Sequence, residues 1–201
     1  MSDTNSNFNA LNRRAVVARL LRDRGDAMVV TSLGNPTFDV SAAGDTPLNF
    51  YLWGAMGGAA MVGLGMAIAQ PKRRVVAIVG DGEMMMALGS LATIACEKQV
   101  NLAVIVLNNE HYAETGMQPA HAGRGVDLVG IARATGFKDV SLVNTQDELE
   151  SLSSRLFSST GPLFSTIKIS TDPNPVSLPP RDGPYLRSRF REAILGAAAS
   201  K

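Results

Sequence analysis

The sequence has little cysteine, little net charge and no long apolar run. Cys96 is the only cysteine among 201 residues, so the chain cannot form an internal disulfide or ligate an iron–sulfur cluster by itself. This cysteine usage is typical of a reducing cytoplasm, which is the compartment we expect. Cys96 stands among helix-forming residues, and we expect its side chain to lie in the core.

Charge and hydropathy exclude further classes of partner. The formal net charge is +1, which gives no electrostatic reason to bind nucleic acid or an anionic membrane surface. No apolar run approaches the length of a membrane-spanning helix, and the first residues lack a signal-peptide pattern. We therefore expect neither nucleic acid nor membrane as a partner, and a chain of this length favours one domain with a substantial core.

The most informative stretch contains two apolar runs that end in polar residues. Val75–Val79 is short, continuous and rich in β-branched residues, as is typical of a strand buried on both faces of a parallel sheet, and it ends in Gly80-Asp81-Gly82. Leu102–Leu107 is a second such run, and it ends in Asn108-Asn109. Between them, Met84–Lys98 has helix-forming composition, so we expect a single crossover helix.

This strand-helix-strand order brings Asp81 and Asn109 to the same edge of the sheet, because parallel strands end on one side. Carboxylate and amide oxygens suit Mg²⁺, which completes its coordination with phosphate oxygens. The glycines on both sides of Asp81 allow close approach of a diphosphate to the backbone. The pattern predicts a magnesium-diphosphate site, although either motif alone is also typical of an ordinary turn.

Together the two motifs resemble the thiamine-diphosphate motif, which belongs to the diphosphate-binding (PP) domain of thiamine-diphosphate enzymes. The flanking runs NFYLWGAMGGAAMVGLGMAIAQ and LNNEHYAETGMQPAH are similar to the β subunit of sulfopyruvate decarboxylase and to the C-terminal half of phosphonopyruvate decarboxylase. The resemblance covers Met28 to Ile169. Met117 stands where that branch is expected to have glycine, and this departure bears on the substrate rather than on the cofactor.

The predicted fold class is α/β, a mainly parallel sheet with helices on both faces, and the resemblance implies the thiamine-diphosphate-binding fold of the PP type. We expect a flexible N-terminus at residues 1–9, a PP-type domain at 10–171, and a proline-rich arm with a C-terminal helix at 172–201. The arginines of the first helix, including Arg13, are expected on a solvated face. The remaining expected strands are 28–33, 139–143 and 163–169, and the irregular segments are 38–47 and 110–125. The expected helices are 11–24, 58–69, 126–136, 147–158 and 185–199. Gly136 is a plausible helix stop, and Thr145-Gln146-Asp147-Glu148 resembles a capping box.

The resemblance implies a set of cofactor-binding residues. Gly54, Ala55 and Met56 would hold the aminopyrimidine ring, with the Met56 side chain wedged between the two rings of the cofactor. Asp81, Asn109 and the backbone carbonyl of His111 would ligate Mg²⁺. The cofactor-binding residues are Gly54, Ala55, Met56, Gly80, Asp81, Gly82, Glu83, Asn109, His111 and Tyr112.

Candidates for contact with substrate lie in the irregular segment after Asn109, because long irregular segments at the active edge of a sheet are commonly functional. His121 is the candidate catalytic residue, and Gln118 and Arg124 are candidates for binding substrate. An exposed histidine without a role is the alternative interpretation of His121.

One required group has no identified source in this chain. Thiamine-diphosphate enzymes use a glutamate on the aminopyrimidine, and it comes from a pyrimidine-binding (PYR) domain. A chain with room for one domain therefore requires an α-type PYR subunit as its partner, in an α₂β₂ or larger heteromer. The resemblance implies the β-type subunit of a thiamine-diphosphate- and Mg²⁺-dependent 2-oxo acid decarboxylase. The alternatives are a carboligase subunit similar to acetolactate synthase, and a cofactor-holding or regulatory subunit without turnover.

Overall fold

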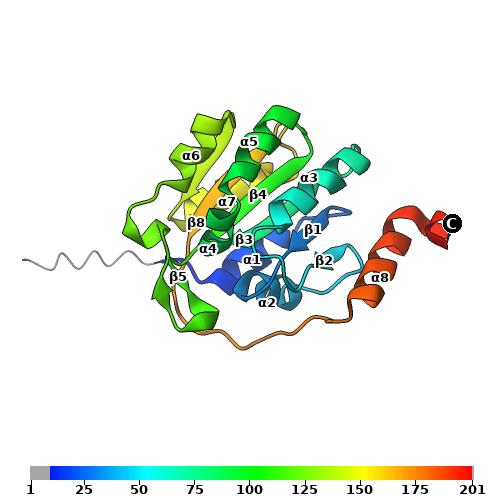
Figure 1. Ribbon diagram of the computed structural model, residues 1–201, viewed down its shortest axis with the longest axis horizontal. Helices are drawn as coiled ribbons and strands as arrows, with labels where there is room; N and C mark the ends of the chain where they lie inside the picture. The colour runs from blue at the N-terminus through cyan, green and yellow to red at the C-terminus, as the bar shows by residue number, and fades with distance from the viewer. Residues whose placement is uncertain (1–9, 201) are drawn as a thin grey trace, which may run out of the picture.

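The computed structural model describes residues 10–200, so the expected flexible segment at 1–9 lies outside the described residues. Six parallel strands form the central sheet in the order β2-β1-β3-β4-β8-β7 (Figure 1). The strands are β1 (Met28–Thr31), β2 (Asn49–Tyr51), β3 (Val75–Gly80), β4 (Leu102–Asn108), β7 (Asp139–Val143) and β8 (Leu163–Lys168).

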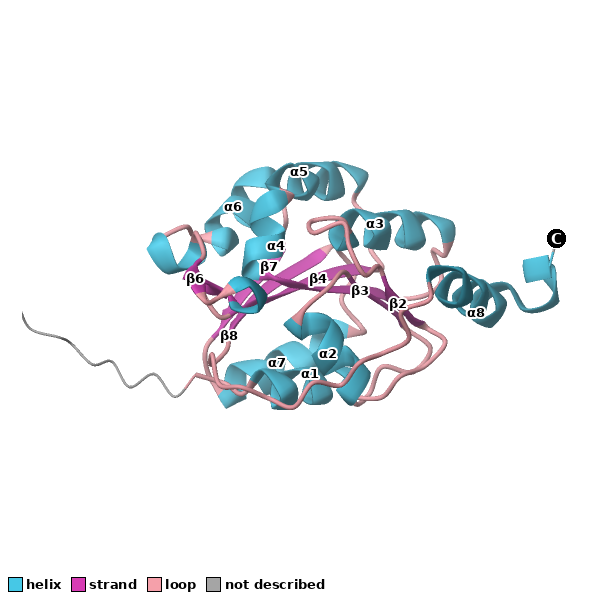
Figure 2. Cartoon of the chain, turned by 60° about the horizontal axis from the view of Figure 1, so that its bottom comes forward, coloured by secondary structure: helices cyan, strands magenta, loops and turns pink. Residues whose placement is uncertain are grey.

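Helices cover both faces of this sheet, which confirms the predicted α/β class (Figure 2). One face carries α3 (Ala59–Ala69), α4 (Asp81–Met86), α5 (Leu88–Glu97) and α6 (Leu128–Thr135). The other carries α1 (Arg13–Leu21), α2 (Asn35–Ala42) and α7 (Gln146–Leu156). The last helix, α8 (Gly183–Leu195), packs at the β2 edge. In residues 10–200 no helix has both the length and the apolar character needed to cross a membrane.

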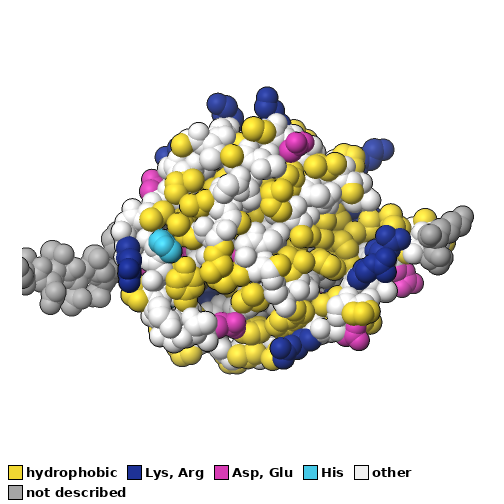
Figure 3. Space-filling view, viewed as in Figure 1, with side chains coloured by type: hydrophobic (Ala, Val, Ile, Leu, Met, Phe, Trp, Pro, Cys, Tyr) yellow, Lys and Arg dark blue, Asp and Glu magenta, His cyan; other side chains and the backbone are white. Residues whose placement is uncertain are grey.

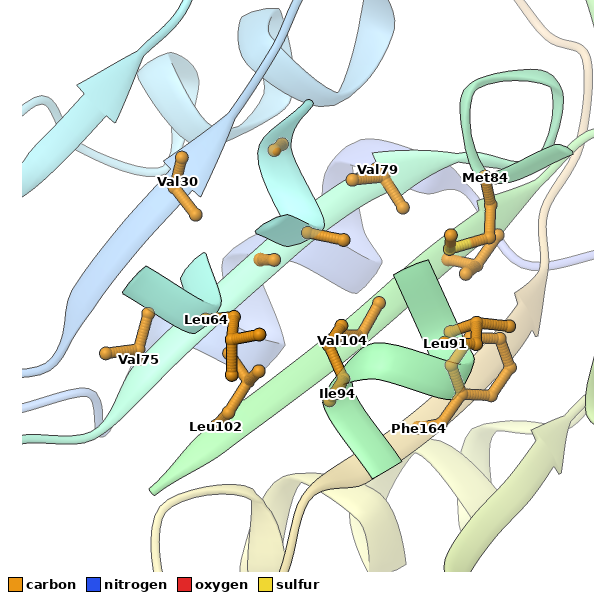
Figure 4. Packing of buried hydrophobic residues seen from close by; sticks show 14 of the residues in the cluster. Val30, Leu64, Val75, Val79, Met84, Leu91, Ile94, Leu102, Val104 and Phe164 are labelled. Atoms are coloured by element: carbon orange, nitrogen blue, oxygen red, sulfur yellow. The ribbon is translucent and has the colours of Figure 1, made fainter. Parts of the chain in front are cut away.

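The two layers of helices explain why the central strands are continuously apolar. Side chains of β3 alternate between the two faces, so Val75 packs under α3 and α5 while Val76 packs toward the opposite helices. Both faces are buried, and neither can carry polar residues without a partner. Figure 4 shows the first of these clusters, in which Leu64 of α3 and Ile94 of α5 lie over Leu102 and Val104 of β4.

Two helix ends follow the sequence prediction. Thr145 accepts a hydrogen bond from the Glu148 backbone N–H, and the Glu148 carboxylate accepts one from the Thr145 N–H, which is a complete capping box at the start of α7. Gly136 ends α6 with a φ of 111°, a conformation that favours glycine.

Three elements differ from the prediction. Phe38–Pro47 was expected to be irregular, but residues up to Ala42 belong to α2, whose first turn contains Pro36. The expected single helix Met84–Lys98 is two helices, because Ala87 has φ −129° and ψ 34°. A Cβ atom at Gly57 would lie 3.1 Å from the Ala87 Cβ, so the loop before α3 packs directly on this break. The third element is strand β2, which was not predicted because its three residues are too few to show an alternation of apolar and polar side chains.

Two single residues also lie where they were not expected. Cys96 is exposed, because Leu91, Ile94 and Ala95 are the α5 residues that face the core. Arg13 is buried rather than solvated, and its guanidinium lies 2.5 Å from the carboxylate of Asp39 in α2. This ion pair joins α1 to α2, a contact that helical periodicity alone does not specify.

Candidate functional site

A cavity of about 160 Å³ opens at the carboxyl ends of the central strands. In parallel α/β sheets this edge is where ligands bind. Eight of the ten predicted cofactor residues line it, and Gly54 and Ala55 do not. The lining residues from the predicted set are Met56, Gly80, Asp81, Gly82, Glu83, Asn109, His111 and Tyr112.

Asp81 begins α4 directly after β3, and its side chain is buried. Burial raises the pKa of its carboxyl from 3.8 to about 6, while nearby backbone N–H groups and the Lys168 ammonium partly oppose this shift. Its Oδ2 accepts no hydrogen bond from any residue between 10 and 200. A buried carboxylate oxygen without a partner is costly in a folded protein, and a bound cation would satisfy it.

Asn109 and His111 form a tight turn beside Asp81. The Asn109 Oδ1 accepts the His111 backbone N–H at 3.1 Å, and the His111 Nδ1 lies 2.8 Å from the Asn109 carbonyl. Glu110 between them has a φ of 65°. The turn therefore holds the Nδ1 side of the His111 ring against the backbone and fixes the orientation of the ring.

The donor set in this region is small. Within the described residues, no group of three His, Cys, Asp or Glu side chains could hold a metal ion. The three predicted ligands all line the cavity, where Asp81 offers a carboxylate, Asn109 an amide and His111 a backbone carbonyl. Such a set suits Mg²⁺, which keeps water or phosphate oxygens in its remaining positions.

Gly82 follows Asp81 and touches an aromatic wall of the cavity. A Cβ atom at this position would lie 2.3 Å from Cε1 of Tyr112, so only glycine fits while the ring stays in place. The absence of a side chain at Gly82 lets the ring of Tyr112 pack directly on the first turn of α4.

Met56 reaches the cavity from the loop between β2 and α3. Trp53, Ala55 and Gly57 in this loop all have left-handed φ values, of 51°, 50° and 95°. The buried Glu83 carboxylate accepts the Gly57 N–H at 3.4 Å, and burial raises the pKa of Glu83. Glu83 therefore joins α4 to the loop that carries Met56.

The segment after Asn109 is a small hairpin rather than an unstructured loop. It contains β5 (His111–Tyr112) and β6 (Gln118–Pro119). Met117 in this hairpin has a φ of 60°, which explains why glycine is the residue expected there.

The three candidate substrate residues do not line the cavity. The Gln118 side chain is exposed and bonded to Thr115, through its Nε2 to the backbone oxygen at 2.7 Å and its Oε1 to the hydroxyl at 2.9 Å. His121 and Arg124 are exposed at a short 3₁₀ turn. The roles of these three residues therefore stay predictions, since none of the three lines the cavity.

Lys168 is a further cation at this edge of the sheet, and it belongs to none of the predicted motifs. It ends β8, pairs with Glu110, and acts electrostatically on Asp81. A signal was available, because Lys168 is a polar residue at the carboxyl end of a predicted strand, as Asp81 and Asn109 are. The Lys168 ammonium places one positive charge near the buried Asp81 carboxylate.

Comparison with known proteins identifies the family of this chain. The family described as thiamine pyrophosphate enzyme, C-terminal TPP binding domain, matches residues 33–167. The chain is a member of this family, and its cofactor is thiamine diphosphate. It is 32% identical over 187 residues to sulfopyruvate decarboxylase subunit beta from Methanothermobacter thermautotrophicus, an alignment that covers 93% of this chain and 97% of that one.

Two further relatives are longer proteins. Phosphonopyruvate decarboxylase from Streptomyces viridochromogenes is 38% identical over 151 residues, which is 75% of this chain and 38% of that protein. The crystal structure of benzoylformate decarboxylase from Polynucleobacter necessarius superposes with a TM-score of 0.67 at 21% identity, covering 83% of this chain and 34% of that one. The match therefore spans nearly the full length of the separate beta subunit and about a third of each longer relative.

Proposed function

We propose that this chain is the PP-domain, β-type subunit of a heteromeric 2-oxo acid decarboxylase that uses thiamine diphosphate and Mg²⁺. The end-to-end match to a sulfopyruvate decarboxylase beta subunit is the observation that carries the proposal. The substrate class is a short 2-oxo acid with a second acidic group, such as sulfopyruvate or phosphonopyruvate, and the products are an aldehyde and carbon dioxide. The named relatives favour this activity over a carboligase or a subunit without turnover.

The residues of the cavity fit the proposed metal and cofactor. Asp81 offers a buried oxygen that has no partner among residues 10–200, and Asn109 and the His111 backbone offer neutral oxygens next to it. We assign these three residues as the Mg²⁺ ligands. Gly80 and Gly82 leave the backbone open to a diphosphate. Lys168 offsets part of the negative charge that a diphosphate brings.

The protein groups then position and protect the reacting part of the site. When bound, thiamine diphosphate supplies the nucleophilic carbon and the electron sink that decarboxylation of a 2-oxo acid needs. Met56 lines the cavity and would support the two rings of the bound cofactor, since a flexible apolar side chain can fill the space between them. Tyr112 and Ile169 line the cavity with apolar surface. Fixed geometry of this kind can contribute several orders of magnitude to a rate.

The catalytic glutamate comes from the α-type PYR subunit in this proposal. The cavity contains three acidic residues, Asp81, Glu83 and Glu114. Asp81 is assigned to the metal, Glu83 to the loop of Met56, and Glu114 lies against Gly34, with its Cδ 3.3 Å from the position of a Cβ there. An assembly of two subunits of each kind, or a larger one, would place each site between chains.

The outer surface of the fold is consistent with such a contact. Met61 and Ile68 of α3 and Met86 of α4 are exposed, and apolar side chains gather on this face of the molecule (Figure 3). The helix α3 contains no charged residue, whereas a helix facing water on one side ordinarily has a polar stripe. We therefore expect another subunit of the assembly to cover the exposed face of α3.

The test is reconstitution with an α-type PYR subunit. We expect release of carbon dioxide from sulfopyruvate or phosphonopyruvate only when both chains, Mg²⁺ and thiamine diphosphate are present. Asp81→Asn in the same complex should lose turnover, and Asp172→Asn, at an exposed position, should keep it. Condensation products formed from pyruvate, without aldehyde release, would instead indicate a carboligase.

A further inference from the structure

An extended arm, residues 170–182, leaves β8 and crosses the molecule to the opposite edge of the sheet (Figure 1). The Pro175 carbonyl accepts a hydrogen bond from Arg14 Nη2 at 2.6 Å, and the Ser177 hydroxyl lies 3.1 Å from that of Ser41. The arm is therefore tied to α1 and to α2 along its course.

The helix α8 then anchors the end of the arm at strand β2. Leu186 belongs to the core on one face of the sheet and Phe190 to the core on the other, so α8 covers the sheet edge between them. The rings of Phe190 and Phe50 lie 5.2 Å apart, and Arg189 pairs with Asp45 at 2.7 Å. This burial holds the C-terminal end of the arm, while the buried strand β8 precedes its other end.

The arm ends on Trp53, at the start of the cavity loop. The indole Nε1–H donates a hydrogen bond to the Pro180 carbonyl at 2.7 Å. The Arg181 guanidinium carbon lies 5.0 Å from the centroid of the indole ring, within the range of a cation–π contact. The Trp53 backbone N–H also donates to the Ser32 carbonyl at 2.8 Å. Side chain and backbone of Trp53 are thus held by different parts of the fold.

The loop beyond Trp53 requires such restraint. Trp53 and Ala55 are non-glycine residues with left-handed φ, and each costs about 1 kcal/mol or more relative to an ordinary backbone conformation. Conformations of this kind persist only where surrounding contacts hold them. Glu83 holds the loop at Gly57, and the arm holds it at Trp53. Met56 lies between these two restraints and lines the cavity.

We infer that Trp53 is a positioning residue of the cofactor site, and that the C-terminal arm is the clamp through which it acts. The inference rests on the proposed function, because it assigns the clamp to the Met56 loop of the cofactor cavity. Pro180 and Arg181 hold the indole, the indole fixes the left-handed start of the loop, and the loop fixes Met56. The arm follows the last strand of the sheet in the sequence, so its role at this cavity is visible only in three dimensions.

The first test separates positioning from binding. Trp53→Phe keeps an aromatic ring but removes the N–H donor to Pro180, and it is measured in the complex with the α-type subunit. We expect kcat to fall about tenfold, with KM and the dissociation constant of Mg²⁺-thiamine diphosphate changed less than about twofold, because a small misplacement affects reactive geometry more than binding. Arg181→Gln should lower kcat in the same direction. Arg187→Gln is the matched control, since Arg187 is also exposed, lies on α8, and makes no ion pair within residues 10–200.

A spectroscopic measurement gives an independent readout. Trp53 is the only tryptophan in the sequence, so the intrinsic tryptophan emission of this chain reports on this position alone. Arg181→Gln should shift or intensify the emission of the full chain, and Arg187→Gln should not. Adding Mg²⁺ and thiamine diphosphate should change the emission of the wild-type chain in a saturable way, because the loop joins the indole to the cavity.

The outcomes distinguish the clamp from the proposed function. A wild-type complex that binds no thiamine diphosphate and decarboxylates no 2-oxo acid would overturn the proposed function, and the clamp with it. A fully active wild type, together with wild-type kcat, KM and cofactor affinity in Trp53→Phe, would overturn the clamp alone. If Trp53→Phe fails to fold, Arg181→Gln decides, and an unchanged kcat and emission in that folded variant would overturn the clamp.

Discussion

Replacing Asp81 by asparagine should make the ligand-free chain more stable while it removes metal-dependent cofactor binding. Burial raises the pKa of the Asp81 carboxyl from 3.8 to about 6. A shift of about two pKa units corresponds to about 3 kcal/mol of preference for the protonated form. The fold therefore bears a cost for the charged carboxylate at neutral pH, and asparagine removes the charge while it keeps a similar shape.

The sign of the pH dependence follows from the direction of this shift. Below pH 3.8 the carboxyl is protonated in both the folded and the unfolded chain, so it contributes no penalty. Between pH 3.8 and about 6 the unfolded chain loses the proton first, and the folded chain becomes less stable as pH rises. Above about pH 6 the penalty is constant. The difference in unfolding free energy between Asp81→Asn and wild type should therefore grow from near zero at pH 3.8 to about 2–3 kcal/mol at pH 7.

The assay is urea unfolding of the full chain at several pH values, with and without ligands. Mg²⁺ and thiamine diphosphate at about 100 times the dissociation constant should stabilise the wild type by about 2.7 kcal/mol. The Asp81→Asn variant should gain almost nothing, so ligands should cancel or reverse the difference in stability between the two proteins. Asp172→Asn, at an exposed position, is the control and should match wild type throughout.

Two results would refute this reasoning. Lower stability of Asp81→Asn than of wild type at pH 7 without ligands would show that burial does not penalise the carboxylate. Equal stabilisation of both proteins by Mg²⁺ and thiamine diphosphate would show that Asp81 is not a metal ligand. The first result is obtained with the chain alone, whereas the second counts only where the ligands stabilise the wild type, because the proposed site lies between the two chains.

Other changes test separate parts of the structure. Met56→Ala should lower kcat of the reconstituted enzyme far more than its affinity for thiamine diphosphate, and equal turnover would show that Met56 is only a packing residue. The chain without an α-type subunit should release no carbon dioxide from any 2-oxo acid, and steady turnover by the chain alone would contradict the shared site. Met117→Gly should raise the unfolding free energy by up to about 1 kcal/mol, because glycine adopts its φ of 60° without steric cost. Phe190→Ala should lower it by about 3 kcal/mol in denaturant unfolding, because the ring is buried against Phe50, and a loss near zero would show that α8 is loosely attached.

The amino-acid pattern was sufficient for the features that depend on neighbouring residues. Continuous β-branched runs predicted β3 and β4, because a strand covered on both faces has no polar side. The capping box at Thr145 and the terminal glycine at Gly136 predicted helix ends through contacts within one turn. The convergence of Asp81 and Asn109 on one cavity also followed, because a parallel crossover leaves no other arrangement of the two strand ends.

Contacts between distant segments decided the rest. The helix α2 has little apolar periodicity of its own, and Asp39 within it is buried against Arg13 of α1. The crossover helix breaks at Ala87 where Gly57 packs on it. His121, Gln118 and Arg124 lie outside the cavity because the segment folds on itself as a hairpin. The proline-rich arm returns to Trp53 because α8 finds its apolar partners at the β2 edge, and such partners are chosen by the packing of the whole chain.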